Sequence, residues 1–500
     1  MEHPLIRRIA TVLALNPSAP AIECEGRWLS WGELADYARH IGSLITERTG
    51  SRHPRVGIML RNRPEHVAAL LGVFLIGGTV VVINPSGGDD RVRADLAELR
   101  LPILIGQAAD LIRLADPQSA TAAITLPESG APARFTVPAG HPVADSGRPG
   151  VAVWMLTSGT TGPPKRVELT YDMLARSVLG ADPESAPTPA ELRRGVAIVN
   201  SPLVHVGGVF RVLLCVTEAR SFVLLEKFEL HRWLAAVREH RPGAVSLVPA
   251  ALRTVLHSGA TREDLASVRV VTSGTAPLSA EDSEAFTAKF GIPVLTSYAA
   301  TEFGGGVASW TLSDHRKYWA LKRGSAGRAN PGAQLRVVDD DGRPLGPDQQ
   351  GLLEVKPAQL GTDSDWMRTT DLARIDADGF LWILGRADQA IIRGGFKVIP
   401  DHVRAALEAH PAVAGAAVVG RRDERLGEVP VAMVELRRQR EASGQQLLDF
   451  LRTRLSRYEI PTEIAVVAAI PRTASGKPDL TAVSAHIGTP LSSGSGSRDR

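Results

Sequence analysis

Short apolar runs of strand length alternate with amphipathic stretches of helix length through the first half of the chain. The apolar runs lie at residues 55–59, 79–83, 196–200, 221–225, 244–248 and 268–272, and helix-like stretches lie at 65–76 and 231–240. Strands that alternate with helices pair side by side in parallel sheets. The pattern therefore predicts a layered, largely parallel α/β fold.

This pattern changes further along the chain. Residues 106–150 are rich in glycine and proline, which predicts an irregular excursion between two halves. Between residues 324 and 355, short strand-like runs with a turn at Asp340-Asp341-Gly342 predict a small β subdomain. After residues 385–388 a compact α+β unit is expected, with helices at 401–410 and 444–455 and strands at 413–420 and 429–436.

The fold class that follows is α/β, with a large N-terminal region of layered sheets and a small α+β C-terminal domain. A chain of 500 residues is too long for a single core, so at least two domains are expected. We place the N-terminal domain at residues 1–384, a hinge at 385–388 and the C-terminal domain at 389–487. Residues 488–500, rich in serine and glycine, are expected to form a disordered tail.

Composition narrows the class of protein. The net charge of +3 is too small to suggest a nucleic-acid partner. Cys24 and Cys215 lie far apart in sequence, without metal-ligand neighbours at the usual spacing, which fits two reduced thiols in a cytoplasmic protein. The longest apolar tract, residues 67–83, falls short of a membrane span and contains Gly77-Gly78, so no membrane span is expected.

A loop rich in small and hydroxyl residues follows the apolar run at 151–156. It consists of Thr157, Ser158, Gly159, Thr160, Thr161, Gly162, two prolines and Lys165. Glycines let a backbone approach an anion, hydroxyls donate to its oxygens, and a lysine adds a point charge. The order is not that of a Walker A loop, because two prolines separate Gly162 from Lys165. A polyphosphate site is predicted, with a plain surface turn as the alternative.

This loop resembles the phosphate-binding signature of the adenylate-forming superfamily, which contains acyl- and aryl-CoA ligases, peptide-synthetase adenylation domains and beetle luciferases. Five further motifs follow in that family's order, so the resemblance covers residues 9–487 or so. It implies ATP, Mg²⁺ and coenzyme A as cofactors. It also implies two half-reactions at one site, between which the C-terminal domain rotates.

Two of these motifs bear on the acid substrate. In residues 200–210 the resemblance places His205 at the floor of the carboxylate pocket, whereas a lone histidine of this kind is otherwise a core residue. Peptide-synthetase relatives carry Phe-Asp near this position, so His205-Val206 argues against an α-amino acid. In residues 271–278 the resemblance assigns part of the adenine and acyl pockets to Ser273, Gly274, Thr275 and Ala276.

The segment at 297–304 resembles the family's nucleotide motif. There Tyr298 would stack on adenine, the Thr301 hydroxyl would meet the α-phosphate and Glu302 would hold the magnesium ion. Ala299 replaces the usual glycine, and the neighbouring Ala300 is expected to line the acyl pocket.

The remaining motifs supply the ribose site, the hinge and the catalytic lysine. By resemblance, Asp371 and Arg386 meet the ribose, Asp388 is the hinge residue, and Gly394-Gly395 line the pantetheine tunnel. Lys477 matches the catalytic lysine of the first half-reaction.

The resemblance implies an ATP-dependent ligase for a small-molecule carboxylic acid, with CoA or an acyl carrier protein as the acceptor. Arg166, Ala299 and Thr370 each stand where the family has glycine, so an enzyme specialised for the second half-reaction is an alternative. A luciferase-like oxygenase and a non-catalytic nucleotide-binding protein are alternatives of other classes. Nothing in the sequence indicates the oligomeric state.

Overall fold

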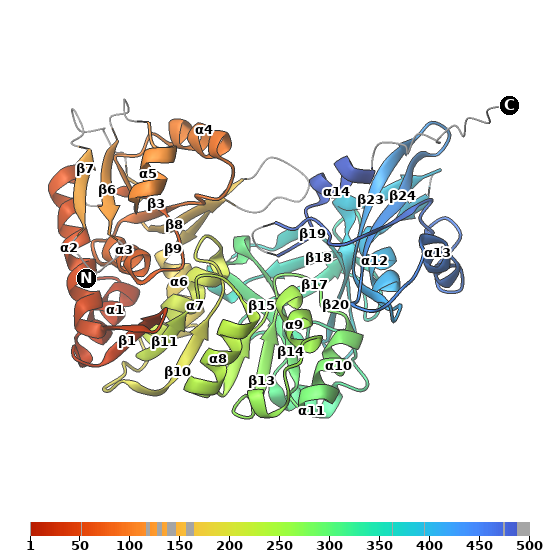
Figure 1. Cartoon of the computed structure of the whole chain (residues 1–500), viewed down its shortest axis with the longest axis horizontal. Coiled ribbons are helices and arrows are strands. Elements are labelled where there is room, and N and C mark those ends of the chain that lie inside the picture. The colour runs from red at the N-terminus through yellow and green to blue at the C-terminus, as the bar shows by residue number, and fades with distance from the viewer. Residues whose placement is uncertain are drawn as a thin grey trace.

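The computed structural model describes residues 2–51, 53–116, 121–127, 133–137, 147–156, 165–362, 364–394, 396–473 and 476–487. The N-terminal part of the chain builds the larger body, and the C-terminal elements form a smaller unit at its other end (Figure 1).

The large body contains a seven-stranded sheet with the strand order β7-β6-β5-β3-β4-β8-β9. Its central pairs are parallel and only the two outer pairs are antiparallel. The strands are β3 (Arg55–Met59), β4 (Thr79–Ile83), β5 (Ile103–Gln107), β6 (Ala122–Leu126), β7 (Arg134–Val137), β8 (Val151–Leu156) and β9 (Arg166–Thr170). The helices that accompany them are α2 (Trp31–Thr49), α3 (Pro64–Leu75), α4 (Asp89–Leu99) and α5 (Ala108–Leu114).

The expectation of an irregular excursion at residues 106–150 was wrong for the described part of that segment. It contains α5 and the strands β6 and β7, which extend the seven-stranded sheet beyond β5. The glycine- and proline-rich composition masked short apolar runs, and β6 is buried along its whole length. Tertiary pairing therefore outweighed local composition here.

A second sheet packs against the first across a shared core that includes Trp31, Phe74 and Phe222. Its order is β10-β11-β1-β2. The strands are β1 (Pro20–Cys24), β2 (Arg27–Ser30), β10 (Arg193–Val199) and β11 (Arg220–Leu224), and the helices beside them are α1 (Pro4–Leu15), α6 (Tyr171–Leu179) and α7 (Val206–Thr217).

A third sheet continues the large body with the order β12-β13-β14-β15-β16. The strands are β12 (Ala244–Ser246), β13 (Val270–Ser273), β14 (Val294–Ala300), β15 (Gly305–Ser309) and β16 (Arg328–Ala329). The helical elements are α8 (Leu230–His240), α9 (Pro249–Leu256), η1 (Glu263–Leu265), α10 (Ala280–Phe290), η2 (Thr301–Phe303) and α11 (Leu312–Tyr318). β12 is shorter than predicted because Pro249 begins α9 directly after it.

The predicted small β subdomain is confirmed as an antiparallel sheet. Its elements are β17 (Gln334–Val338), β18 (Gly351–Lys356), η3 (Ala358–Leu360), β19 (Met367–Ile375) and β20 (Leu381–Arg386).

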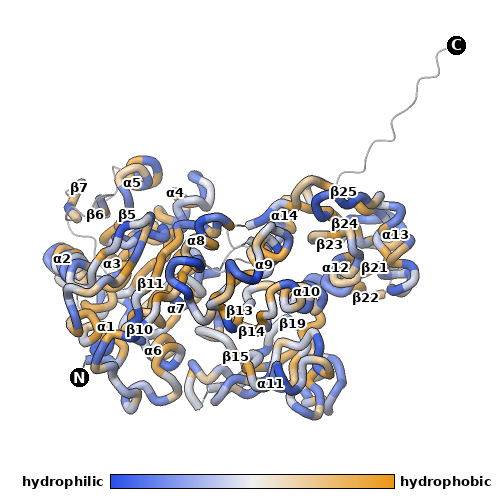
Figure 2. Tube along the Cα trace, turned by 60° about the horizontal axis from the view of Figure 1, so that its bottom comes forward, coloured by the Kyte–Doolittle hydropathy of each residue, from blue (hydrophilic) through white to orange (hydrophobic). Residues whose placement is uncertain are grey.

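The C-terminal elements form the α+β unit that the sequence predicts. A sheet of β21, β22, β23, β24 and β25 packs against α12 and α13 around its own core. Figures 1 and 2 show this unit at one end of the molecule, beyond α9 and α10. Its elements are η4 (Ala387–Gln389), β21 (Ile391–Arg393), β22 (Phe396–Val398), α12 (Pro400–Glu408), β23 (Val413–Asp423), β24 (Gly427–Leu436), α13 (Gly444–Arg452), β25 (Ile464–Val467) and α14 (Leu480–Ile487).

The length and hydropathy of the helices decide whether one of them could span a membrane. In the part of the chain that the structure describes, every helix is too short or too polar to cross a bilayer.

A buried histidine makes the stability of the large body depend on pH. His66 on α3 is fully buried, its Nε2 has no hydrogen-bond partner among the residues that the structure describes, and its Nδ1 accepts from the Arg61 N–H at 3.4 Å. Burial, followed by the charge of Arg61, lowers the pKa of His66 to about 3. Between pH 6.5 and 3 the unfolded chain therefore takes up a proton that the folded chain does not.

The folded protein is expected to lose stability as the pH falls from 6.5 towards 3. At pH 4.5 the loss from His66 is about 3 kcal/mol relative to pH 7, because the unfolded pKa lies two units higher. Urea unfolding of the wild type and of His66→Gln at pH 7 and pH 4.5 measures this loss in the free energy of unfolding. The variant should lose about 3 kcal/mol less between pH 7 and pH 4.5, and an equal loss in both proteins would exclude His66 as the cause.

Candidate active site between the two units

His205 occupies a tight turn between β10 and α7. Its N–H donates to the Pro202 carbonyl at 3.0 Å, and its own carbonyl accepts from the Gly208 N–H at 3.0 Å. A side chain at Gly208 would place its Cβ 2.2 Å from the Pro202 carbonyl oxygen, so only glycine fits there. The His205 Nε2 is buried and has no hydrogen-bond partner within the described part of the chain. Burial and the nearby Lys477 lower the pKa of His205, which keeps the imidazole neutral.

Residues 273–276 follow the end of β13. Ser273 is buried, and no described residue forms a hydrogen bond with its Oγ. A Cβ at Gly274 would lie 2.8 Å from the Ser297 Oγ of the neighbouring strand β14. Thr275 has a φ of +70°, which is a strained conformation for a β-branched residue. Two buried polar atoms without partners, on Ser273 and His205, leave hydrogen-bonding capacity for a bound molecule.

An acid, a phenol and a guanidinium meet at the end of the β subdomain. The Tyr298 hydroxyl donates a hydrogen bond to the Asp371 carboxylate, and Asp371 on β19 pairs in register with Arg386 on β20. Burial raises the pKa of Asp371, although the Tyr298 hydroxyl and Arg386 oppose that rise. Arg386 also holds Asp388 through two hydrogen bonds of 2.9 and 2.5 Å.

Thr301 and Glu302 lie on the short helix η2, directly after β14. The buried Phe303 anchors this turn, and its ring lies 5.9 Å from that of Tyr298. Glu302 is exposed, and Ala300 is partly exposed ahead of the turn. The turn therefore presents a hydroxyl and a carboxylate beside Tyr298.

Lys477 comes from the C-terminal unit and closes the site. A turn fixes it, in which the Thr473 N–H donates to the Lys477 carbonyl at 2.8 Å and Gly476 has a φ of +79°. Burial and then Arg386 lower the pKa of Lys477, whereas Asp371 and Glu302 act to raise it. The ammonium thus lies within electrostatic reach of residues from both units.

Lys477 thus lies within electrostatic range of His205, Glu302, Asp371 and Arg386. Thr157, Ser158, Gly159, Thr160, Thr161, Gly162 and Gly395 lie outside the described residues. Lys165 is exposed just before β9. Gly394 has a φ of +56° and is exposed between β21 and β22.

None of the three residues that replace family glycines has a strained backbone. Arg166, Ala299 and Thr370 lie in β9, β14 and β19, and each has a φ outside the left-handed region. Ala299 and Thr370 are exposed, and the Arg166 guanidinium is held by the Asp95 carboxylate at 2.5 Å. The replacements therefore impose no backbone cost of the kind that glycine would relieve.

A cavity of about 190 Å³ lies between the two units beside this site. Thr275 and Ala276 line it from the large body, and its charged lining residues include more cations, among them Arg386, Arg472 and Lys477, than carboxylates, which are Asp401 and Glu408. Such a surface favours an anionic ligand.

A buried ionic network joins the two units beside the cavity, and sequence reasoning missed it. Arg253 on α9 donates to Asp282 on α10 at 2.6 Å and to Glu408 on α12 at 3.3 Å. Arg404 holds the same Glu408 carboxylate at 2.8 Å. Arg437 reaches Asp282 at 3.4 Å from the C-terminal unit. The side chains of Asp282 and Glu408 are only 5% and 6% exposed, so loss of one partner leaves a buried charge unpaired.

Glu408→Gln is expected to loosen the contact between the units. The substitution weakens the bonds to Arg253 and Arg404, and trypsin should then cut at Arg386 or Arg393 about tenfold faster, because opening exposes this connection. Glu463→Gln is the matched control, since Glu463 pairs at 2.5 Å with Arg421 inside the C-terminal unit. Equal cutting rates in the two variants would contradict a role of the network in holding the units together.

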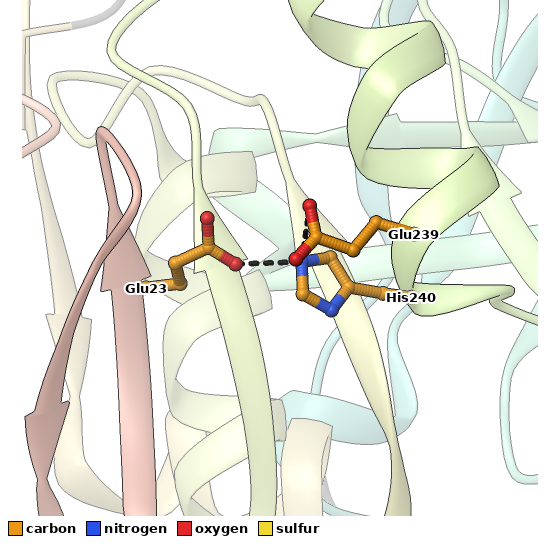
Figure 3. A group of neighbouring side chains, drawn as sticks. All are labelled: Glu23, Glu239 and His240. Atoms are coloured by element: carbon orange, nitrogen blue, oxygen red, sulfur yellow. Dashed lines mark ion pairs between the residues drawn. The ribbon is translucent and has the colours of Figure 1, made fainter.

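A second group of ionisable residues lies away from this site, between β1 and α8. Glu23, Glu239 and His240 form the one group of three potential metal ligands among the described residues (Figure 3). His240 Nε2 lies 2.6 Å from a Glu23 carboxylate oxygen and 4.0 Å from one of Glu239. The contact between His240 and Glu23 links α8 to β1, and this structural role explains the group.

Comparison with known families identifies two matching regions. The AMP-binding enzyme family matches residues 9–362, and the AMP-binding enzyme C-terminal domain matches residues 402–477.

Enzymes of similar sequence include several CoA ligases. The chain is 29% identical to the indoleacetate–CoA ligase of Aromatoleum aromaticum over 489 residues, covering 93% of this chain and 94% of that enzyme. It is 29% identical to the 2-succinylbenzoate–CoA ligase of Bacillus velezensis over 478 residues, with the same two coverages. It is 30% identical to 4-coumarate–CoA ligase 3 of Oryza sativa subsp. japonica, covering 89% of this chain and 86% of that enzyme.

Solved structures of similar fold include nucleotide complexes. ATP-bound MatB from Rhodopseudomonas palustris superimposes with a TM-score of 0.81 at 25% identity, covering 97% of this chain and 98% of that one. The O-succinylbenzoate coenzyme A synthetase of Bacillus subtilis, in complex with ATP and a magnesium ion, gives a TM-score of 0.76 at 25% identity, with coverages of 96% and 98%.

Proposed function

Because the chain belongs to the AMP-binding enzyme family and is an adenylate-forming enzyme akin to the acid–CoA ligases, we propose that it joins a carboxylic acid without an α-amino group to coenzyme A at the expense of ATP. The observation that carries this proposal is the position of Lys477. It reaches from the C-terminal unit to His205, Glu302 and Asp371 of the large body.

The first half-reaction needs charge compensation more than acid–base catalysis. The substrate carboxylate attacks the α-phosphorus of ATP, an acyl–phosphate bond forms, and pyrophosphate leaves with the bonding electron pair. Lys477 would neutralise charge on the carboxylate and the α-phosphate, and Thr301 would donate to the same phosphate. His205, neutral and without a partner at Nε2, would border the acid as the floor of its pocket.

The polar groups of the site fit a nucleotide and a divalent cation. Asp371 and Arg386 would hold the ribose, Tyr298 would stack on adenine, and Ser273, Gly274, Thr275 and Ala276 would border the base. Glu302 is an exposed carboxylate beside Thr301, and Mg²⁺ usually takes only one or two carboxylates besides phosphate oxygens. Bound there, Mg²⁺ would neutralise phosphate charge.

In the second half-reaction a thiol attacks the acyl-adenylate carbonyl, a thioester bond forms, and AMP leaves. We take Asp388 as the hinge that absorbs the rotation between the steps, and Gly394-Gly395 as the wall of the pantetheine tunnel. The basic cavity beside Lys477 supports binding of anionic substrates between the units.

The alternatives differ in their support. An enzyme specialised for the second half-reaction was suggested by the three replaced glycines; their backbones are unstrained, so strain does not support this alternative, and separate assays of the two half-reactions decide it. A non-catalytic nucleotide-binding protein would have no need for Lys477 and Glu302 together. An acyl carrier protein as the acceptor and a luciferase-like oxygenase are decided by product analysis.

The test is incubation of the protein with ATP, Mg²⁺, CoA and a panel of carboxylic acids. We expect acid-dependent formation of AMP, pyrophosphate and an acyl-CoA thioester. A thioester formed only on a phosphopantetheinylated carrier protein would change the acceptor, and light with a luciferin would change the class of reaction. No AMP with any acid would overturn the proposal.

A further inference from the structure

An arginine lies on the helix that His205 begins, one and a half turns further along. Arg211 of α7 makes one described hydrogen bond, from its Nη2 to the Thr272 Oγ1 of β13 at 3.1 Å. Thr272 directly precedes Ser273 and Gly274 at the end of that strand. Arg211 therefore connects the helix that follows His205 with the strand that leads into Ser273 and Gly274, the segment that the resemblance assigns to the adenine and acyl pockets.

The guanidinium of Arg211 has no acidic partner among the residues that the structure describes. The only ionisable group that acts on it there is the thiol of Cys215. Burial raises the pKa of Cys215 to about 12, so this thiol is neutral. Burial also lowers the pKa of Arg211 itself. A guanidinium offers five N–H donors, so most of the hydrogen-bonding capacity of Arg211 is unused within this part of the chain.

The helix face that carries Arg211 is open. Gly207 precedes Arg211 by four residues, so the two share one face of α7. A Cβ built at Gly207 would meet nothing within 4 Å, and Arg211 itself keeps some exposed surface. His205 and Arg211 are six residues apart, about 9 Å along the axis. Open space thus lies over Gly207, on the face of α7 that also carries Arg211.

We propose that Arg211 binds a second carboxylate of the acid substrate, which makes the substrate a dicarboxylic acid. One carboxylate would lie at His205 and Lys477 for activation, the carbon chain over Gly207, and the other carboxylate on the Arg211 fork. The assignment rests on the proposed function. The relatives do not decide it, because 2-succinylbenzoate carries two carboxylates and indoleacetate carries one.

The experiment compares acids that differ only in the distal group. Dicarboxylic acids from succinate to suberate are tested beside the monocarboxylic acids of the same chain length, with ATP, Mg²⁺ and CoA. The enzymes are the wild type, Arg211→Met and Thr272→Val. Thr272→Val removes the one described hydrogen bond of Arg211 but keeps its charge, so it separates substrate binding from local structure.

In the wild type, kcat/KM should be roughly 50-fold higher for the best dicarboxylic acid than for its monocarboxylic match. Arg211→Met should lower kcat/KM for that diacid about 100-fold, mainly through KM, and change the value for the monoacid less than about threefold. Thr272→Val should keep the preference for the diacid.

Different results would contradict the proposed ligase function and the proposed role of Arg211. Thioesters formed from monocarboxylic acids, with every diacid refused, would overturn the role of Arg211 and leave the ligase intact. An equal loss for both kinds of acid in Arg211→Met would mean that the arginine acts only in folding. No AMP with any acid would refute the ligase itself.

Discussion

Replacing Lys477 with alanine is expected to lower the rate of acid-dependent exchange of pyrophosphate into ATP by a factor on the order of 10³. The lysine comes from the C-terminal unit and interacts electrostatically with His205, Glu302 and Asp371. Conversion of a supplied acyl-adenylate and CoA to thioester should change by less than about threefold, because a lysine that serves only the first transition state contributes nothing to the second.

Lys227→Ala provides the matched control, since Lys227 is an exposed lysine that pairs with Glu229 on the surface. It should leave both half-reactions unchanged. A folded Lys477→Ala protein that loses both half-reactions to the same extent would show that the lysine does not serve the first step alone.

Replacing Gly208 with alanine is expected to damage the acid site through the backbone. The new Cβ would lie 2.2 Å from the carbonyl oxygen and 2.5 Å from the carbonyl carbon of Pro202. The turn that holds His205 must then shift, at a cost of about 1–3 kcal/mol in stability. Pyrophosphate exchange should fall roughly tenfold or more, because the displaced His205 no longer borders the acid.

Gly207→Ala is the control for this substitution, because its Cβ would meet nothing within 4 Å. In chemical unfolding it should be as stable as the wild type or more stable by up to about 1 kcal/mol, since alanine favours a helix over glycine. Equal stability of both variants would show that the Pro202 turn yields without cost.

The parts of the fold that follow from local sequence were predictable. The strands at 55–59 and 79–83 have the predicted bounds, because each apolar run begins after a proline or glycine and meets a polar residue within two positions of its end. The motif residues Glu302, Asp371 and Lys477 interact electrostatically, although only Glu302 and Lys477 lie in turns and Asp371 lies within β19.

The parts that depend on distant partners were not predictable. Arg253 and Glu408 are 155 residues apart, and neither stands in a pattern that marks a buried ion pair. The role of Arg211 could not be predicted either, because in the sequence it is one cation in an otherwise apolar helix. Its isolation becomes visible only when its neighbours in space, such as Thr272, are known.

The strained backbone of Thr275 has a consequence for directed evolution. A β-branched residue with φ near +70° costs on the order of 1 kcal/mol or more, which glycine would recover. A library screened for thermostability alone would therefore enrich Thr275→Gly. Because Thr275 lines the cavity beside Lys477, that gain would reshape the wall of the site that we assign to the nucleotide. Improvement of this enzyme by heat selection should therefore exclude position 275 or score turnover in the same round.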